Sequence, residues 1–222
     1  MSKIIDINEA ASKIFDGATV MFGGFMANGS AENIIDALVK RGVRDLTIIC
    51  NDSGLIDKGV GKLISAKQCK KLIASHIGLN KETGRQMTAG ELEVLLVPQG
   101  TLVEQIRAGG YGLGGVLTRT GIGTLIEAGK QKVEVDGVTY LLEKPIRADF
   151  AIIFGAIADE FGNICAVGST NNFNNVMASA ADTVILEARK LEKIGAVNPN
   201  IVDTPGIFVD FIVDGSKCGG GE

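Results

Sequence analysis

The sequence predicts an α/β protein with three layers, in which helices cover both faces of a mostly parallel β-sheet and a β-hairpin forms an added flap. Continuously apolar runs such as DLTIIC and DTVILEA alternate with amphipathic helical stretches, which is typical of parallel strands buried on both faces. The 30 glycines, about twice the usual share, separate these runs as tight turns. No linker rich in proline or serine interrupts the chain, so we expect one domain over residues 1–217 and a flexible tail over residues 218–222.

The strands are predicted from short apolar runs that end at glycine, proline or polar residues. In chain order these runs place strands at residues 18–22, 45–50, 70–75, 92–97, 149–158, 182–188 and 206–213. The stretch KVEVDGVTYLLE alternates around Asp136 and Gly137, and Asp-Gly between alternating residues is a strong signal for a two-residue hairpin turn. The hairpin is the expected flap outside the parallel sheet.

The helices are predicted from apolar residues at helical spacing. They lie at residues 6–15, 31–40, 100–110 and 173–181. Asn8 and Ser30 are the expected caps of the first two helices, and Gly42 and the Gly109-Gly110 pair end the second and third.

Composition and charge exclude several classes of function. The net charge is −4, so no basic excess points to nucleic acid, and no basic amphipathic helix points to a membrane surface. The N-terminus lacks the apolar core of a signal peptide, and the longest apolar run is too short to cross a bilayer. Cysteines at widely spaced positions form no CxxC pair, so we expect no metal site, no disulfide framework and a reduced cytoplasmic setting; they are Cys50, Cys69, Cys165 and Cys218.

The stretch GATVMFGGFMANGSAENII joins a strand to a helix through a glycine-rich loop, as in proteins that bind phosphorylated cofactors. It is not a P-loop, because Ser30 and Ala31 stand where lysine and serine or threonine are needed. The string G-x-G-x-x-G at residues 110–115 is not a dinucleotide fingerprint either, since it follows a helix. Bare backbone and unsatisfied N–H groups at the helix start could face a ligand, or the loop is a tight turn capped by Ser30.

The motifs, taken together, resemble family I coenzyme A transferases, in particular the A (alpha) subunit. The first signature of that family is an Asp-Gly pair, a hydrophobic run, Gly-Gly-Phe, three residues and a glycine. Here the matching residues are Asp16, Gly17, Gly23, Gly24, Phe25 and Gly29. Ala31 replaces the usual proline, which leaves the helix entry less fixed. The resemblance runs from about residue 10 to about residue 210 and is strongest to alpha subunits of acetate/butyrate–acetoacetate transferases.

The resemblance implies a mechanism in which a glutamate carboxylate attacks an acyl-CoA thioester and then becomes a glutamyl-CoA thioester. In the family this glutamate lies in a Ser-Glu-Asn-Gly motif on the B (beta) subunit, and no such string occurs here. The chain is therefore expected to be half of an enzyme, in an α2β2 or larger heteromer. Glutamates in promising contexts are better explained by structural or solvent-exposed roles; they are Glu32, Glu91, Glu104 and Glu160.

The resemblance also assigns contacts with coenzyme A, which is expected as a carrier without a metal. These contacts come from one loop, comprising Gly24, Phe25, Met26, Ala27, Asn28, Gly29 and Ser30. Gln99 resembles a family glutamine near the reacting carboxylate, or it only caps the helix after Pro98. Asn51 ends a strand and either lines the substrate site or stabilises a turn, which we favour.

His76, the only histidine, also lies at a strand end. A general-base role is conceivable for a lone histidine, but a packed or substrate-lining residue fits the family chemistry better. Five glycines form either a loop over the cleft or a turn-rich connection; they are Gly109, Gly110, Gly112, Gly114 and Gly115. No residue identifies which short-chain acid is used.

Two alternatives come from other classes of function. A ligand-sensing module of similar fold normally carries an attached DNA-binding segment, and no basic helix-turn-helix pattern precedes this domain. A sugar-phosphate isomerase of similar fold needs its own acid/base carboxylate, and none is well placed in the sequence.

Overall fold

The computed structural model describes residues 2–218 and centres on a seven-stranded parallel sheet. Its strand order is β13-β11-β8-β1-β2-β3-β4, and every neighbouring pair runs parallel. The strands are β1 (Thr19–Phe22), β2 (Leu46–Asp52), β3 (Cys69–His76), β4 (Glu93–Leu96), β8 (Ala148–Gly155), β11 (Ala181–Ala188) and β13 (Phe211–Asp214). The chain builds one half of the sheet outward from β1, then returns to build the other half on the opposite side of β1.

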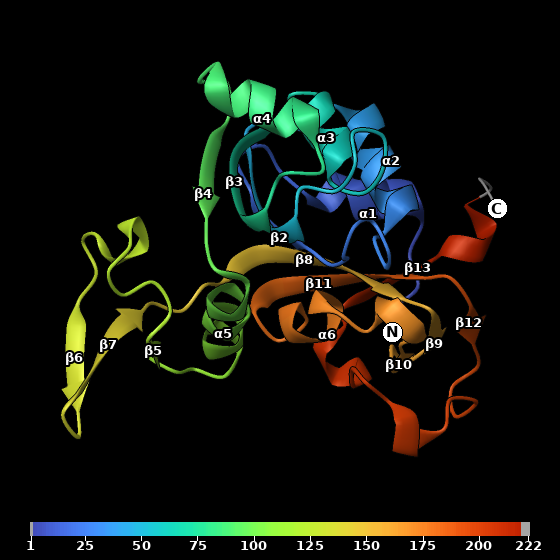
Figure 1. Cartoon of the computed structure of the whole chain (residues 1–222). Coiled ribbons are helices and arrows are strands. Elements are labelled where there is room, and N and C mark those ends of the chain that lie inside the picture. Colours follow the sequence, from blue (N-terminus) through green and yellow to red (C-terminus); the bar gives the residue numbers. More distant parts are fainter. Residues whose placement is uncertain (1, 219–222) are drawn as a thin grey trace.

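Helices cover both faces of this sheet, which confirms the three predicted layers (Figure 1). One face carries α1 (Ile7–Lys13), α2 (Glu32–Arg41), α3 (Gly61–Ser65) and α4 (Lys81–Thr88), and the other carries α5 (Gln99–Gly110) and α6 (Phe173–Met177). Each face has its own apolar core. Ile34, Ile35 and Leu38 of α2 belong to the first, and Leu102 and Ile106 of α5 belong to the second.

The strands read as continuous apolar runs because successive residues serve opposite cores. In β1, Val20 and Phe22 belong to the core under α2, whereas Met21 between them belongs to the core under α5. Side chains alternate across a strand, so a strand buried on both faces has no polar side.

Two small sheets lie outside the parallel sheet. The predicted hairpin is β6 (Lys132–Val135) and β7 (Val138–Glu143), joined at Asp136 and Gly137, whose φ angles of 51° and 74° fit a two-residue hairpin turn. With β5 (Val116–Thr118) it forms an arm that projects from the body in Figure 1. The second small sheet contains β9 (Ile157–Asp159), β10 (Ile164–Cys165) and β12 (Leu191–Glu192).

Several local predictions were wrong. Asp6, rather than Asn8, caps α1, because its carboxylate accepts the Asn8 N–H at 2.8 Å. The predicted strand at residues 206–213 begins as a 3₁₀ turn, so β13 starts only at Phe211. Gly109 and Gly110 are the last residues of α5 rather than part of a loop, and a Cβ on Gly109 would lie 2.0 Å from the Ile146 carbonyl oxygen.

The predicted tail falls partly outside the described residues. Cys218 is described, and it packs against the core under α2. Residues 219–222 lie outside the described part of the chain. Within residues 2–218, no helix is long and apolar enough to cross a membrane.

We predict that the buried thiols of Cys50 and Cys69 are unreactive in the folded protein. Burial raises the pKa of the Cys69 thiol to about 12 and that of Cys50 well above its usual range, so neither forms the reactive thiolate at pH 8. Titration with a thiol-specific disulfide reagent checks this: Cys50 and Cys69 react only after unfolding. Rapid modification of either thiol in the native protein would contradict the packing described here.

Candidate functional site

The candidate site lies where the strand order reverses on either side of β1. The carboxyl ends of β1, β2 and β8 meet there, because both neighbours of β1 run parallel to it. In open α/β sheets, ligands bind in the crevice outside the carboxyl ends of strands at such a switch point.

The loop after β1 is a miniature hairpin with a strained tip. Phe25 and Asn28 exchange two backbone hydrogen bonds, of 3.0 and 2.9 Å. Between them, Met26 and Ala27 adopt positive φ angles of 49° and 65°. Such a conformation costs about 1–2 kcal/mol for each residue other than glycine and persists only where the surroundings enforce it. Phe25 and Met26 nevertheless expose their apolar side chains, at 42% and 43%.

Two asparagines from the start of α6 hold this loop. Asn172 accepts the Gly24 N–H at 3.1 Å and donates to the Asn28 carbonyl at 3.1 Å. Asn174 donates to the Gly29 carbonyl at 3.0 Å, and its amide fills the space where Gly23 would carry a Cβ. Neither residue was predicted from the sequence, although the polar run NNFNN ahead of an apolar stretch is a visible signal.

The start of α2 is capped by Glu187 of β11, so the prediction that Ser30 caps it was wrong. The Glu187 carboxylate accepts the Ile34 N–H at 2.9 Å and both the backbone and side-chain N–H groups of Asn33. Ser30 instead directs its hydroxyl to the Gly23 carbonyl at 3.5 Å.

The remaining amides of the first turn of α2 are also paired. Glu32 and Ile35 donate to the carbonyls of Ser30 and Ala31. The four amides at this helix start are therefore occupied within the protein, and a ligand must use the loop rather than the helix terminus.

A cavity of about 320 Å³ lies beside the loop. Its lining residues are Phe25, Asn51, Gln99, Gly100, Val103, Asn172 and Phe173. The structure thus brings together three residues that the sequence placed in the site, namely Phe25, Asn51 and Gln99.

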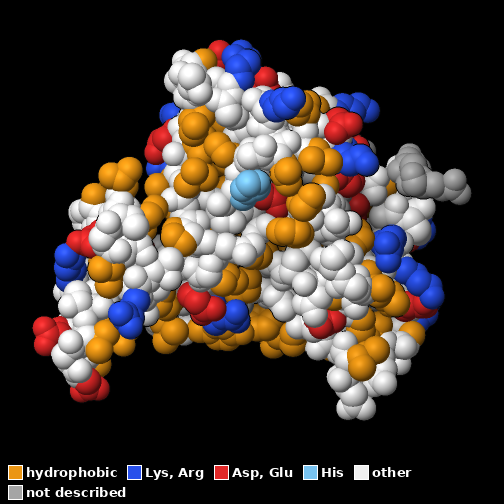
Figure 2. Space-filling model, viewed as in Figure 1, with side chains coloured by type: hydrophobic (Ala, Val, Ile, Leu, Met, Phe, Trp, Pro, Cys, Tyr) orange, Lys and Arg blue, Asp and Glu red, His pale blue; other side chains and the backbone are white. Residues whose placement is uncertain are grey.

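His76 does not line that cavity. Its side chain is exposed at the end of β3, and Figure 2 shows it on the surface of the molecule. Its contact with substrate stays a prediction.

The polar side chains of the cavity form one chain of hydrogen bonds. Gln99 donates to the Asn51 side-chain oxygen at 2.6 Å, and Asn51 donates to the Asp52 carboxylate at 2.9 Å. Asn51 lies within β2, and its side chain bonds to Gln99. The favoured prediction that Asn51 stabilises a turn was wrong. Gln99 is the first residue of α5, and Pro98 is its cap residue, so the capping alternative for Gln99 was also wrong.

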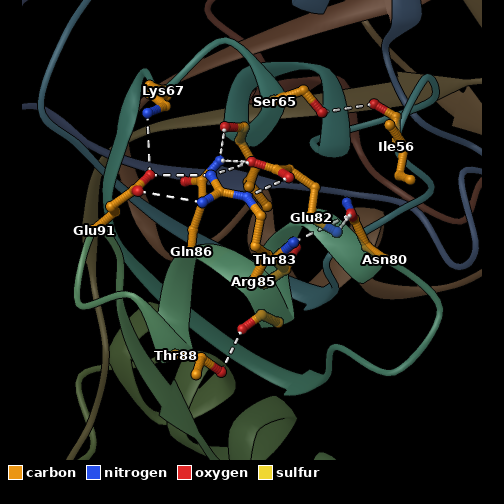
Figure 3. A network of polar contacts seen from close by, with 12 residues as sticks. Ile56, Ser65, Lys67, Asn80, Glu82, Thr83, Arg85, Gln86, Thr88 and Glu91 are labelled. Carbon is orange, nitrogen blue, oxygen red and sulfur yellow. Dashed lines mark hydrogen bonds and ion pairs between the residues drawn. The ribbon is translucent and has the colours of Figure 1, made fainter.

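A second polar network joins the loop that follows β2 to α3 and α4, and Figure 3 draws part of it. Asn80 caps α4 by accepting the N–H groups of Glu82 and Thr83, and it donates to the Ser53 carbonyl at 3.0 Å. Ser65 donates to the Ile56 carbonyl at 3.0 Å. This network fixes carbonyl groups of the loop after β2 to α3 and α4.

The glutamates that were assigned structural roles have structural partners. Glu104 pairs with Arg107 at 3.1 Å, and Glu160 pairs with Lys193 at 2.7 Å. Glu32 accepts the Gly59 N–H at 2.7 Å and pairs with Lys62.

Glu91 lies just before β4. Its carboxylate is paired with Arg85 and Lys67, an arrangement visible in Figure 3.

The fold and the site define an α/β protein that presents a glycine-lined loop at the switch point of a parallel sheet. The Coenzyme A transferase family profile matches residues 4–215, and the chain belongs to that family, which confirms the resemblance of its motifs. It is 48% identical to acetate CoA-transferase subunit alpha of Escherichia coli K12, with 96% of each chain covered. It is 52% identical to the acetoacetyl-CoA:acetate/butyrate CoA transferase alpha subunit of Clostridium acetobutylicum, with 96% of this chain and 97% of that one covered.

The fold is shared with solved members of the family. An acyl-CoA transferase of Escherichia coli O157:H7, solved as a thioester complex with CoA, superposes with a TM-score of 0.84 at 24% identity. The match covers 96% of this chain and 47% of that one, so this chain spans about half the length of that relative.

We predict that the difference in unfolding free energy between the wild type and the Glu187→Gln variant depends on pH. Burial raises the pKa of Glu187 above its ordinary value of 4.5, against the lowering effect of the hydrogen bonds from Ile34 and Asn33. The unfolded chain therefore releases this proton at a lower pH than the folded chain, and the stability contribution of this group is lost as pH rises through the folded pKa.

The free energy of unfolding of the wild type, measured relative to Glu187→Gln, should fall as the pH rises from about 4 to 7. Urea unfolding of both proteins across that range measures it. A difference that stays constant or grows with pH would contradict the assignment.

Proposed function

We propose that this chain is the alpha subunit of a heteromeric CoA transferase. Together with a beta subunit carrying Ser-Glu-Asn-Gly, in an α2β2 or larger assembly, it moves CoA between a short-chain acyl-CoA and a carboxylic acid. The acids are acetate, butyrate or acetoacetate, in keeping with the names of the alpha-subunit relatives. We place the assembly in the cytoplasm, since four free cysteines suit a reducing compartment.

The reaction runs through two covalent intermediates on the partner. Its glutamate carboxylate attacks the thioester carbonyl and expels CoA thiolate, leaving a mixed anhydride. The thiolate then attacks the glutamyl carbonyl and releases the first acid as its carboxylate. The acceptor acid reverses these steps, so one difficult exchange becomes a series of easier ones.

The observation that supports this proposal most is the composition of the cavity beside the strained loop. Its polar side chains are the amides of Asn51, Gln99 and Asn172, and none of its lining residues within the described chain is ionisable. Amides can orient an acid or a thioester by hydrogen bonding, but they do not supply a carboxylate nucleophile. A wall of this kind fits a site whose reactive group comes from a second subunit.

The loop also offers backbone donors that the protein leaves unused. Within residues 2–218, neither the Ala27 nor the Gly29 N–H donates a backbone hydrogen bond. Each tetrahedral intermediate of acyl transfer carries an oxyanion that aimed N–H groups stabilise. We assign these donors, with residues 24 to 30 as a whole, to the thioester end of coenzyme A and the reacting carbonyl.

We predict that the purified chain alone exchanges no CoA and that its complex with the beta subunit does. The complex is incubated with acyl-CoA and a panel of acids, and acyl-CoA exchange is followed. Borohydride added after acyl-CoA should reduce the glutamyl thioester on the partner and leave this chain unlabelled. Turnover by this chain alone, or a label on one of its side chains, would overturn the proposal.

The tightness of the loop predicts a strong effect for Gly24→Ala. Gly24 has a φ angle of 120°, and a Cβ there would lie 2.4 Å from the Ser30 hydroxyl, so the loop must shift. A displacement of about 1 Å at a reacting centre costs about 100-fold in rate, so kcat/KM for acyl-CoA should fall by about that factor.

The matched control is Gly42→Ala at the opposite end of α2. It introduces a Cβ at a φ angle of 73° without meeting any atom within 4 Å. Its backbone strain should lower stability by about 1 kcal/mol and leave kcat/KM unchanged. Equal kinetic effects of the two variants would argue against contact between this loop and the substrate.

A further inference from the structure

The carboxylate of Asp52, which is only 7% exposed, joins three parts of the candidate site. One oxygen accepts the Gly54 N–H at 2.9 Å. The other accepts the Met26 N–H and the Asn51 side-chain N–H, both at 2.9 Å. A single buried group therefore holds the strained tip of the first loop, the start of the second loop and an amide of the cavity.

The charge of Asp52 also fixes the direction of the hydrogen-bond chain into the cavity. An ionised carboxylate only accepts, so Asn51 must turn its NH₂ group toward Asp52 and its oxygen toward Gln99. Gln99 must then present its NH₂ group to Asn51. Consequently the Gln99 side-chain oxygen and one of its N–H groups are left for a ligand. Asp52 sets their arrangement through Asn51.

The two loops that Asp52 joins have similar construction and touch each other. Both keep the spacing G-x-x-x-x-G, at residues 24–29 and 54–59. In the second loop, Leu55 and Lys58 exchange backbone hydrogen bonds of 3.2 and 3.3 Å, as Phe25 and Asn28 do in the first. A Cβ on Gly59 would lie 3.2 Å from the Ser30 hydroxyl and 3.5 Å from the Ala27 Cβ, so the two loops lie side by side.

We propose that Asp52 is a positioning residue for CoA transfer. It locks the two glycine loops together at Met26 and Gly54, and it sets the polarity of the Asn51–Gln99 pair that faces the substrate. The assignment to CoA transfer rests on the proposed function, whereas the anchoring of the loops does not.

Asp52→Asn is the direct test, since it keeps the shape of the side chain and replaces one acceptor oxygen with a donor. Whichever way the new amide turns, a donor faces either the Gly54 N–H or the N–H groups of Met26 and Asn51. In the second case Asn51 and Gln99 must reverse, which presents the wrong polarity to the cavity.

Asp159→Asn is the matched control. Asp159 is 1% exposed, and its carboxylate accepts the N–H groups of Phe161, Gly162 and Asn163 at 2.9 to 3.1 Å. It lies on β9 and lines a different cavity together with Phe161 and Asn163. The control therefore removes a buried, multiply bonded carboxylate without touching the candidate site.

The first readout is amide hydrogen exchange in the full chain without any substrate. Exchange at Met26 or at Gly54, whichever amide faces the new donor, should accelerate by about tenfold or more in Asp52→Asn, which corresponds to loss of a hydrogen bond to a charged group. Exchange at both amides should stay unchanged in Asp159→Asn. Unchanged exchange at both amides in Asp52→Asn would overturn the anchoring role, whatever reaction the protein catalyses.

The second readout is kcat of the complex with the beta subunit. Asp52→Asn should lower kcat by about 100-fold, and this factor should shrink in a Gln99→Ala background, because part of the effect passes through Gln99. An equal factor in both backgrounds, or a loss no larger than that of Asp159→Asn, would overturn the positioning role. An inactive wild-type complex would instead refute the proposed function, and the exchange result would still stand.

Discussion

The parallel pairing of β1 with both β2 and β8 is the constraint on which the rest of the structure depends. Because β1 is paired on both sides, the chain leaves it in one direction to build β2, β3 and β4, and returns to build β8, β11 and β13 on the other side. The loops after β1, β2 and β8 must then emerge at the same edge of the sheet. For this reason the glycine loop and Asn51 lie close to Asn172 and Asn174 at the start of α6, although these residues are separated by up to 150 positions along the chain.

Within this edge, buried carboxylates bind backbone donors that would otherwise be available to an anion. Glu187 occupies the start of α2, and Asp52 occupies Met26 and Gly54. A helix start is a ready anion site only while its N–H groups are unpaired, so α2 cannot serve coenzyme A in the way a P-loop helix serves a nucleotide. We infer that recognition is left to the loop itself. Its strained tip is held by Asp52 of β2, and its flanking residues are held by Asn172 and Asn174 at the start of α6.

The sequence predicted most of the fold because its strand signal is strong: a strand buried on both faces has apolar residues on both of its sides, as in β1, β2, β8 and β11. It also identified the loop at residues 24–30, whose glycine spacing is local. The prediction that Ser30 caps α2 failed because capping depends on which acceptor reaches the helix start. The acceptor, Glu187, lies 153 residues from Ile34 along the chain. Asp52, Asn172 and Asn174 were missed for the same reason, and α4 was missed because Met87 is the only large apolar residue in that helix.

The amide character of the cavity has a chemical consequence for a reaction between two carboxylic acids. A cationic wall would bind the free acids strongly in their ground state and would resist the charge changes that accompany anhydride formation. Neutral amides such as those of Gln99 and Asn51 can offer the same groups to an acid, an anhydride or a thioester. The orientation of these two amides is set by the carboxylate of Asp52, which does not line the cavity. In the proposed transfer, charge moves between the partner glutamate, the CoA thiolate and the two acids. A preorganised neutral wall favours none of these charge states over another, so a site divided between two subunits is compatible with this chemistry.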